Sequence, residues 1–422
     1  NEIFLSPLVV ISIIGAGIIV LHWIITKTKQ DYFWLILAVF FSLPFERIPS
    51  IPVGDFSLKI NHILGAILII CYLIDIIKKR EKFIINYLTL PLLGFLFIIS
   101  VSIFQSKVPI ISLITFGQII FVFLLSFIVS SKIDSSEKAE KIFNIIKISS
   151  FLVIIFAFFQ FIGDMIGLPN TITGLRTIYT KGVFGFPRVQ SFFIEPLYLG
   201  NYLYLPLSVF TADILKGKKN LVNILGFVLI SIVIFMTLSR GAILAYIVFV
   251  LLMIFFYPKK TLTIKNLSLF VTILSLAILM VIIVFSFLGE DKKTSYYNQL
   301  TLKDYQITES VMGRLNSYNI AWQAFEEKPL TGIGLFNYGP YSTGYNLDDP
   351  HSQAVANNEY LEVLAETGIF GLTAFMGIIL MIIFATLFAL KNPKILILKT
   401  DLIVLTIGFF AILIQYNFFS TL

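Results

Sequence analysis

The chain has 422 residues, of which 58% are hydrophobic and only 13% are charged, and its net charge is +7. Its mean hydropathy is +0.93. A soluble core cannot bury this much apolar surface, so the composition excludes a soluble globular domain and predicts an integral membrane protein. Nucleic acid is not an expected partner.

Apolar runs of about 20 residues, the length that crosses a bilayer as a helix, recur about a dozen times. The runs are continuously apolar rather than alternating, which favours helices over barrel strands. We expect an all-α polytopic membrane protein with about 12 transmembrane helices. The predicted spans are 5–26, 32–45, 60–77, 83–104, 109–130, 142–168, 193–215, 221–238, 241–257, 267–288, 368–390 and 397–419.

One long polar segment, 289–367, interrupts this pattern. It contains helix stops and Gly-Pro punctuation, which are typical of ordered structure rather than of a tether. We therefore expect residues 1–288 to form the first ten transmembrane helices, 289–367 to form a structured loop, and 368–422 to form the last helices of one membrane domain. The chain does not begin with Met and ends directly after an apolar run, so we expect it to be a piece of a longer protein.

Lysines predict the orientation of the chain, because cytoplasmic loops are enriched in positive charge. Most of them fall in alternate loops, which we assign to the cytoplasm, and the loops 46–59, 169–192 and 289–367 then face outward. The long loop has five basic and eleven acidic residues, a net charge of −6, so the rest of the chain carries +13. The lysines that define the cytoplasmic side are Lys78, Lys79, Lys82, Lys132, Lys138, Lys141, Lys216, Lys218, Lys219, Lys259, Lys260, Lys265, Lys391, Lys394 and Lys399.

Arginines are distributed in the opposite way. The chain has six, and only Arg80 is predicted to be cytoplasmic; the others are Arg47, Arg176, Arg188, Arg240 and Arg314. The loop 169–192 combines Arg176, Lys181 and Arg188 with no acidic residue. Guanidinium groups match phosphate oxygens in a bidentate geometry, which lysine cannot. We predict an outward-facing phosphate or pyrophosphate site; separate contacts of each arginine with lipid headgroups are the alternative, which is strongest for Arg47.

Two motifs place charged residues at the outer ends of predicted spans. In RVQSFFIEPLYLGNYL, Glu195 precedes Pro196 at membrane depth, where an acid is costly and is commonly functional. Its structural alternative is an ion pair with Arg188 or Arg240. In MTLSRGAILAY, Arg240 lies in a tight reversal in which we expect Gly241 to allow the turn and the preceding serine to bond the local backbone.

The segment GRLNSYNIAWQAFEEKPLTGIG predicts a short amphipathic helix in the long loop. Leu315, Tyr318, Trp322 and Phe325 fall on one face of a 3.6-residue period. We expect this stripe to pack against the spans or the lipid surface. Arg314, at the start of the helix, is either a ligand-binding group or the partner of one of the loop's acids.

A second helix is predicted at NNEYLEVLAETGIFGL. Asn357 or Asn358 would cap it, Glu359 enters its first turn, and Gly368 ends or bends it. Upstream, His351 lies in DDPHSQ, outside the membrane, and is a candidate general base; a solvated histidine without a role is the alternative.

The sequence lacks the common signatures of nucleotide and metal sites. It has no Walker loop, no HExxH, no Asp-x-Asp metal pair and no Gly-x-Ser-x-Gly elbow. We therefore expect chemistry with neither a cofactor nor a metal ion. Its single cysteine, Cys71, lies in a predicted span, so no disulfide framework is expected.

Several motifs in order resemble the O-antigen ligase and O-antigen polymerase superfamily of bacterial envelope glycosyltransferases. They are Ser-Arg-Gly at 239–241, Gly-Arg at 313–314 with Trp322 downstream, Pro329 with Gly-Ile-Gly at 332–334, and the closing stretch NNEYLEVLAETGIFGL. The resemblance implies a C-type glycosyltransferase-like fold in the bacterial cytoplasmic membrane. It also implies metal-independent, inverting transfer of a glycan from undecaprenyl pyrophosphate on the extracytoplasmic side.

The resemblance assigns the pyrophosphate-binding arginines to Arg240 and Arg314, with Arg188 as a helper. The family's loop histidine often lies in a His-Asn-x-Tyr-Leu context, whereas this chain has Asn-Asn-Glu-Tyr-Leu at 357–361. Glu195-Pro196 also replaces an Asn-Pro-Asn-like stretch. The base is therefore His351, Glu195 or Glu359. The expected substrate-binding residues are Arg188, Arg176, Lys181, Trp322, Tyr318, Asn357, Asn358 and Glu359.

The expected function is polymerisation, or transfer en bloc, of glycan units in polysaccharide biosynthesis. We favour a polymerase because polymerisation occurs in envelopes with or without lipid A; the alternative acceptor is the lipid A core of lipopolysaccharide, which defines a ligase. A flippase would need charges or broken helices along a midplane cavity, and these spans are nearly free of charge. A non-catalytic assembly subunit is a third class. The expected partners are an undecaprenyl-pyrophosphate-linked oligosaccharide, an acceptor glycan, membrane lipid and a polysaccharide chain-length regulator.

Overall fold

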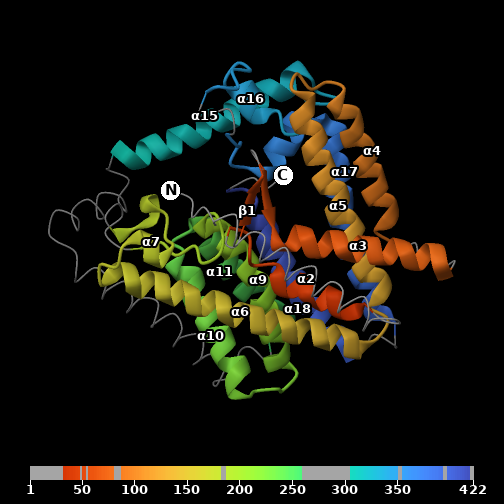
Figure 1. The fold of residues 1–422 in the computed structure, drawn as a ribbon, viewed down its shortest axis with the longest axis vertical. Helices are drawn as coiled ribbons and strands as arrows, with labels where there is room; N and C mark the ends of the chain where they lie inside the picture. Colours follow the sequence, from red (N-terminus) through yellow and green to blue (C-terminus); the bar gives the residue numbers. More distant parts are fainter. Residues whose placement is uncertain are drawn as a thin grey trace.

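A computed structural model describes residues 32–47, 50–53, 56–79, 87–181, 187–258, 305–349, 354–392 and 397–418. The predicted spans 5–26 and 267–288 lie outside these residues, as do Arg80 and His351. Each of the other ten predicted spans contains a helix (Figure 1).

The described chain is mostly helical, as the apolar runs predict. Four helices, α3, α5, α6 and α17, are long and apolar enough to cross a membrane. The helices are α2 (Phe33–Ser42), α3 (Ile60–Lys79), α4 (Thr89–Ile103), α5 (Pro109–Lys132), α6 (Ser136–Met165), α7 (Asn170–Thr173), η1 (Thr177–Tyr179), α9 (Pro196–Leu215), α10 (Leu221–Met236), α11 (Arg240–Phe256), α15 (Tyr305–Glu327), α16 (Tyr338–Ser342), α17 (Glu359–Lys391) and α18 (Lys399–Gln415).

One feature departs from the all-α expectation. The predicted outer loop 46–59 contains an antiparallel hairpin of β1 (Ser50–Val53) and β2 (Phe56–Lys59). The strands pair from Ser50 with Lys59 to Val53 with Phe56. Four-residue strands give too short a pattern to be separated from a loop by periodicity.

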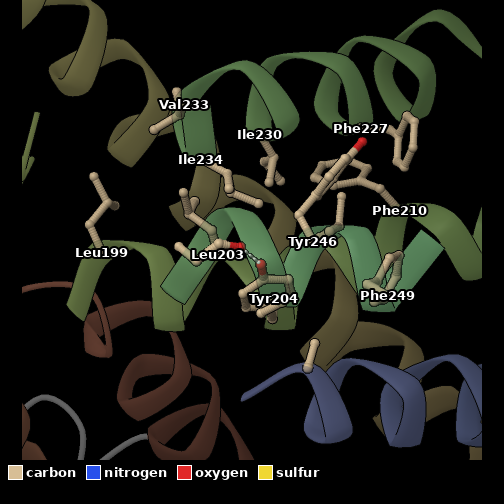
Figure 2. Close-up of a cluster of buried hydrophobic side chains, with 14 of the residues drawn as sticks. Leu199, Leu203, Tyr204, Phe210, Phe227, Ile230, Val233, Ile234, Tyr246 and Phe249 are labelled. Atoms are coloured by element: carbon tan, nitrogen blue, oxygen red, sulfur yellow. Dashed lines mark hydrogen bonds between the residues drawn. The ribbon is translucent and has the colours of Figure 1, made fainter. Parts of the chain in front are cut away.

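The main core lies between α6, α9, α10, α11 and α18 (Figure 2). α9 is its centre, and Leu203, Tyr204, Leu207 and Phe210 on this helix are fully buried. A helix that is apolar on all sides is stable only when other helices or lipid surround it. Gly226 on α10 lets the Phe210 ring approach closely, because a Cβ there would lie 2.4 Å from ring atoms.

The remaining long helices pack beside this core and expose apolar side chains. α2 and α3 pack on each other, α2 also contacts α6, and α4 contacts α5 and α17 (Figure 1). Leu90, Phe97 and Phe104 on or beside α4 are exposed. Exposed side chains of this size are the expected lipid-facing surface of a membrane helix, and in water they would promote association.

The segment after α15 crosses a kink in α17. Gly368 has φ +67°, which interrupts this helix as the sequence predicts, and Gly332 has φ +70°. A Cβ on Gly332 would lie 2.2 Å from the Glu366 carbonyl carbon, so only glycine permits the crossing. Backbone groups freed by the kink find partners here: Ile333 donates to Ala365 at 3.0 Å and Ile369 donates to Pro329 at 2.9 Å.

Lysines and arginines occupy opposite ends of the main bundle. The starts of α6, α10 and α18 and the end of α9 form a lysine end, where Lys216 contacts Asp401 at 2.7 Å and Lys218 contacts Glu140. The starts of α9 and α11 and the ends of α10 and α18 form the other end, which holds Arg240. The separation of the two cation types agrees with the sorting predicted from the sequence.

Candidate functional site

Arg240 is the first residue of α11 and is exposed. Ser239 caps this helix, its Oγ accepting a hydrogen bond from the Ala242 amide at 3.4 Å. The expected role of Gly241 is wrong: it is helical, and the left-handed residue of the turn is Leu238, with φ +51°. Gly241 instead lets Phe418 approach, because a Cβ there would lie 3.1 Å from the Phe418 side chain.

Three helix ends meet beside Arg240. A Cβ on Gly200 of α9 would lie 2.7 Å from Ala242 of α11, so these helices touch near their N-termini. Gln415, at the end of α18, donates to the Leu197 carbonyl at 2.9 Å. The N-termini of α9 and α11 add partial positive charge to this end of the bundle, which favours an anion.

The segment before α9 brings Arg188 to the same place. The Arg188 Nε donates to the Thr237 carbonyl at 3.2 Å, three residues before Arg240. Buried Gln160 of α6 holds this segment: its Oε1 accepts from the Gln190 and Ser191 amides at 3.2 and 2.7 Å. The position of Arg188 is therefore set by α6 as well as by the α10–α11 turn.

Arg314 lies on α15, a helix at the top of the view in Figure 1. One turn later, the Tyr318 hydroxyl donates to the Asn417 carbonyl at 3.3 Å, and the next residue, Phe418, packs on Gly241. The end of α18 therefore connects α15 to the start of α11.

The charges of the three arginines affect one another. The pKa of Arg188 is lowered by burial and by the charges of Arg240 and Arg314, whereas Tyr179 and Glu195 raise it. Arg240 and Arg314 are exposed, and neither forms an ion pair with an acidic residue in the described parts of the chain. The arginine triad of Arg188, Arg240 and Arg314 is thus a concentration of positive charge that an external anion can reach.

A second group of arginines lies beside the triad. The Arg47 guanidinium donates to the Gly174 carbonyl, and Arg176, two residues later, is exposed. The pKa of Arg47 is lowered by burial and by the charge of Arg176. The two groups share the ring of Tyr179, which lies 5.9 Å from the Arg176 guanidinium carbon and 5.6 Å from that of Arg188.

Glu195 is the acid within reach of the triad. It is the N-cap residue of α9 but its side chain does not cap the helix, and it forms no hydrogen bond or ion pair with another described side chain. Its charge acts on Arg188, on Tyr179 and on Glu46. Glu46 lies 3.8 Å from Lys59, and its pKa is raised, mainly by burial.

Several predicted substrate-binding residues form contacts within the fold. Lys181 donates its ammonium group to the Met165 carbonyl at the end of α6, at 2.7 Å. Asn358 caps α17, accepting from the Leu361 amide at 3.1 Å, and Asn357 has φ +57°, a conformation that asparagine tolerates. Glu359 is 1% exposed, and its amide donates to the Tyr416 carbonyl.

Two members of the predicted α15 stripe do not pack against the described helices, so for them only the lipid surface remains of the two expected packing partners. Leu315 and Trp322 are 48% and 49% exposed, and the Trp322 Nε1 donates to Glu326 at 2.7 Å. The packed face of α15 instead contains Ala321 and Ala324, which lie against α16 and α17. Small residues allow this close approach, which a search for large apolar side chains overlooks.

Sequence reasoning missed Gln160, Tyr179 and Glu46 as parts of this region. Gln160 lies in the apolar last part of α6, and its position there was the available signal, because a buried amide needs specific partners. Tyr179 and Glu46 have no sequence signal beyond their proximity to Arg176 and Arg47.

Comparison with known proteins agrees with the resemblance seen in the sequence. Residues 225–376 match the O-antigen ligase family. This match supports the O-antigen ligase and polymerase superfamily and a membrane glycosyltransferase-like function of that type. The matched range contains Arg240 and Arg314, whereas Arg47, Arg176 and Arg188 precede it. No curated protein matches the chain.

Proposed function

We propose that this protein transfers a glycan from a polyprenyl diphosphate carrier to an acceptor sugar, at the extracytoplasmic face of the cytoplasmic membrane. The main support is the convergence of Arg188, Arg240 and Arg314 at the start of α11. Guanidinium groups bind diphosphate oxygens in bidentate fashion. The match of residues 225–376 to the O-antigen ligase family is consistent with such a donor.

In the proposed reaction, the acceptor hydroxyl oxygen attacks the anomeric carbon of the donor. The bond from this carbon to the diphosphate oxygen breaks, and the diphosphate leaves with the electron pair. Attack opposite the leaving group inverts the anomeric centre. The triad stabilises the negative charge that grows on the leaving diphosphate, so no metal ion is required for this role.

Glu195 is the general base in this proposal. Its carboxylate has no hydrogen-bonding partner among the described side chains and lies within electrostatic range of Arg188. Glu359 is less suitable because it is buried. His351 remains the alternative base, and its replacement by alanine distinguishes the two.

The exposed apolar face of α15 fits the lipid part of such a donor. Met312, Leu315 and Trp322 are all exposed on the helix that carries Arg314. We propose that this face contacts membrane lipid or the polyprenyl chain while Arg314 contacts the diphosphate. A polymerase is the form of the reaction that we favour, with a second lipid-linked glycan as the acceptor.

The test uses purified protein in lipid nanodiscs with lipid-linked oligosaccharide extracted from the source organism. We expect a ladder of glycan products and release of undecaprenyl diphosphate, with and without EDTA. Transfer to lipid A core alone would indicate a ligase, whereas movement of intact substrate across vesicles would indicate a flippase. No cleavage of the donor by folded protein would contradict the proposal.

Replacing the two candidate bases completes the test. Glu195→Gln should lower the rate of transfer while leaving donor binding intact, and His351→Ala should retain most activity. The opposite result would assign the base to His351.

A further inference from the structure

We infer that Arg47 and Arg176 form a second anion subsite, which holds a phosphate or diphosphate group of the acceptor while the triad holds that of the donor. The inference depends on the proposed function, because it assigns the second group of arginines to the second substrate. It requires that the two groups be separate, adjacent and both accessible to charged ligands.

The two groups are separate because different segments build them. Arg47 follows α2, and its backbone amide donates to the Phe192 carbonyl at 2.8 Å. Arg176 precedes η1, and its guanidinium donates to the Ile194 carbonyl at 3.5 Å. Both arginines therefore lie along residues 192–194, whereas Arg188 is held at the α10–α11 turn through Thr237.

The two groups are also adjacent. The Tyr179 ring is near both guanidinium groups, at 5.9 Å from the central carbon of Arg176 and 5.6 Å from that of Arg188. Glu195 lies within electrostatic range of both Tyr179 and Arg188.

The charge at this second group is not neutralised by the described chain. Arg47 contacts the Gly174 carbonyl and Arg176 contacts the Ile194 carbonyl, and both of these acceptors are uncharged. Neither arginine forms an ion pair with a described carboxylate. Two like charges held together at a partly buried position are unfavourable, and a bound anion removes the repulsion.

Phosphate is the anion that this arrangement suits best. A guanidinium group has five N–H donors, so Arg47 retains donors beyond the one directed at Gly174. Arg176 is exposed and adds a second guanidinium group that can bind an anion in bidentate fashion. A polymerase acceptor carries a diphosphate at its reducing end, whereas an acidic sugar supplies only a carboxylate; the test separates these two sources.

The first experiment counts ligands by native mass spectrometry, with undecaprenyl diphosphate as the probe and undecaprenol as the control without phosphate. The wild-type protein should bind two molecules of the diphosphate at saturation. Arg176→Ala should retain one, and the double variant Arg240→Ala/Arg314→Ala should also retain one. Lys328→Ala is the matched control, because this outer-loop lysine contacts Gln105 and belongs to neither group, and it should retain two.

A wild-type stoichiometry of one, or two molecules still bound to Arg176→Ala, would overturn this inference. If the wild type binds a single molecule that the double variant loses, the proposed function stands without the second subsite. If the double variant keeps both molecules, the donor site itself is misassigned. Arg176 is the primary target because it is exposed; Arg47→Lys, which keeps a donor for Gly174, tests its neighbour with less risk to folding.

The second experiment measures transfer kinetics. Arg176→Ala should raise the KM for a diphosphate-linked acceptor about tenfold or more, the effect of losing a charged hydrogen bond, with kcat nearly unchanged. The same glycan with a free reducing end should be a poor acceptor for wild type and variant alike. If instead Arg176→Ala impairs only acceptors with acidic sugars, the subsite binds a carboxylate and the assignment to phosphate is wrong.

Discussion

The two ends of the helical bundle hold cations in contrasting ways. At the lysine end, Lys147 and Lys216 both contact Asp213, the latter at 2.9 Å, and Lys216 also contacts Asp401. At the arginine end, Arg240 and Arg314 have no ion pair among the described residues, and Arg47 contacts the uncharged carbonyl of Gly174.

The difference separates charge that maintains the fold from charge that is available to a ligand. Buried ion pairs join α6, α9 and α18, and removing one partner leaves an uncompensated charge. Exposed arginines without carboxylate partners contribute little to folding but create a positive potential. Four predictions test this distinction.

The largest loss of stability is expected from a substitution at the lysine end. Asp213→Ala should lower the free energy of unfolding by about 3–5 kcal/mol, because Lys147 and Lys216 lose their shared partner. Thermal unfolding in nanodiscs measures this loss, and the activity of the molecules that remain folded should be unchanged. A stable Asp213→Ala variant without transfer activity would reverse the roles of the two ends.

Substitutions at the arginine end should lower the rate of transfer rather than the stability of the fold. Arg240→Ala or Arg314→Ala should reduce the rate of transfer about a hundredfold to a thousandfold, the usual loss when one group that stabilises transition-state charge is removed. Arg240→Lys should also be impaired, because a lysine lacks the bidentate fork. The unfolding temperature should change little, since both side chains are exposed. Full activity of both alanine variants would eliminate the diphosphate role.

Replacing Gln160 should affect both the stability of the fold and the rate of glycan transfer. Gln160→Leu removes the acceptor for two buried backbone amides, each of which costs about 1–3 kcal/mol when it has no partner. The segment that holds Arg188 should then be displaced and transfer should slow. Gln160→Glu keeps the acceptor oxygen and should recover more activity than stability. Equal activity of the leucine variant and the wild type would show that this contact does not position Arg188.

The smallest expected effect is on how the stability of the fold depends on pH. Burial raises the pKa of Glu46, so the folded protein binds this proton more tightly than the unfolded chain does. Its contribution to stability is therefore fully present below the usual carboxyl value of 4.5 and is lost as pH rises through the raised pKa. Glu46→Gln should remove this dependence, as measured by the unfolding temperature across pH. A wild-type protein that gains stability relative to Glu46→Gln over the same range would contradict the assignment.

Local signals in the sequence were sufficient for most of the helices. The apolar runs locate ten described helices because each run is long enough to be recognised without its neighbours. Gly368 and Asn358 were also predictable, since a helix kink and an N-cap depend on nearby residues. The β1–β2 hairpin and the packed face of α15 were not, because short strands and small residues leave weak patterns.

By itself, the sequence determined that the chain is mostly helical and apolar enough to cross a membrane, and it predicted that most lysines and arginines lie on opposite sides, because hydropathy and charge act along the chain. Only the tertiary structure decided which arginines are neighbours. Arg188, Arg240 and Arg314 come from three segments, and contacts through Thr237, Asn417 and Phe418 unite them. Such proximity depends on how helices pack, and packing is set by the shapes of many distant side chains at once.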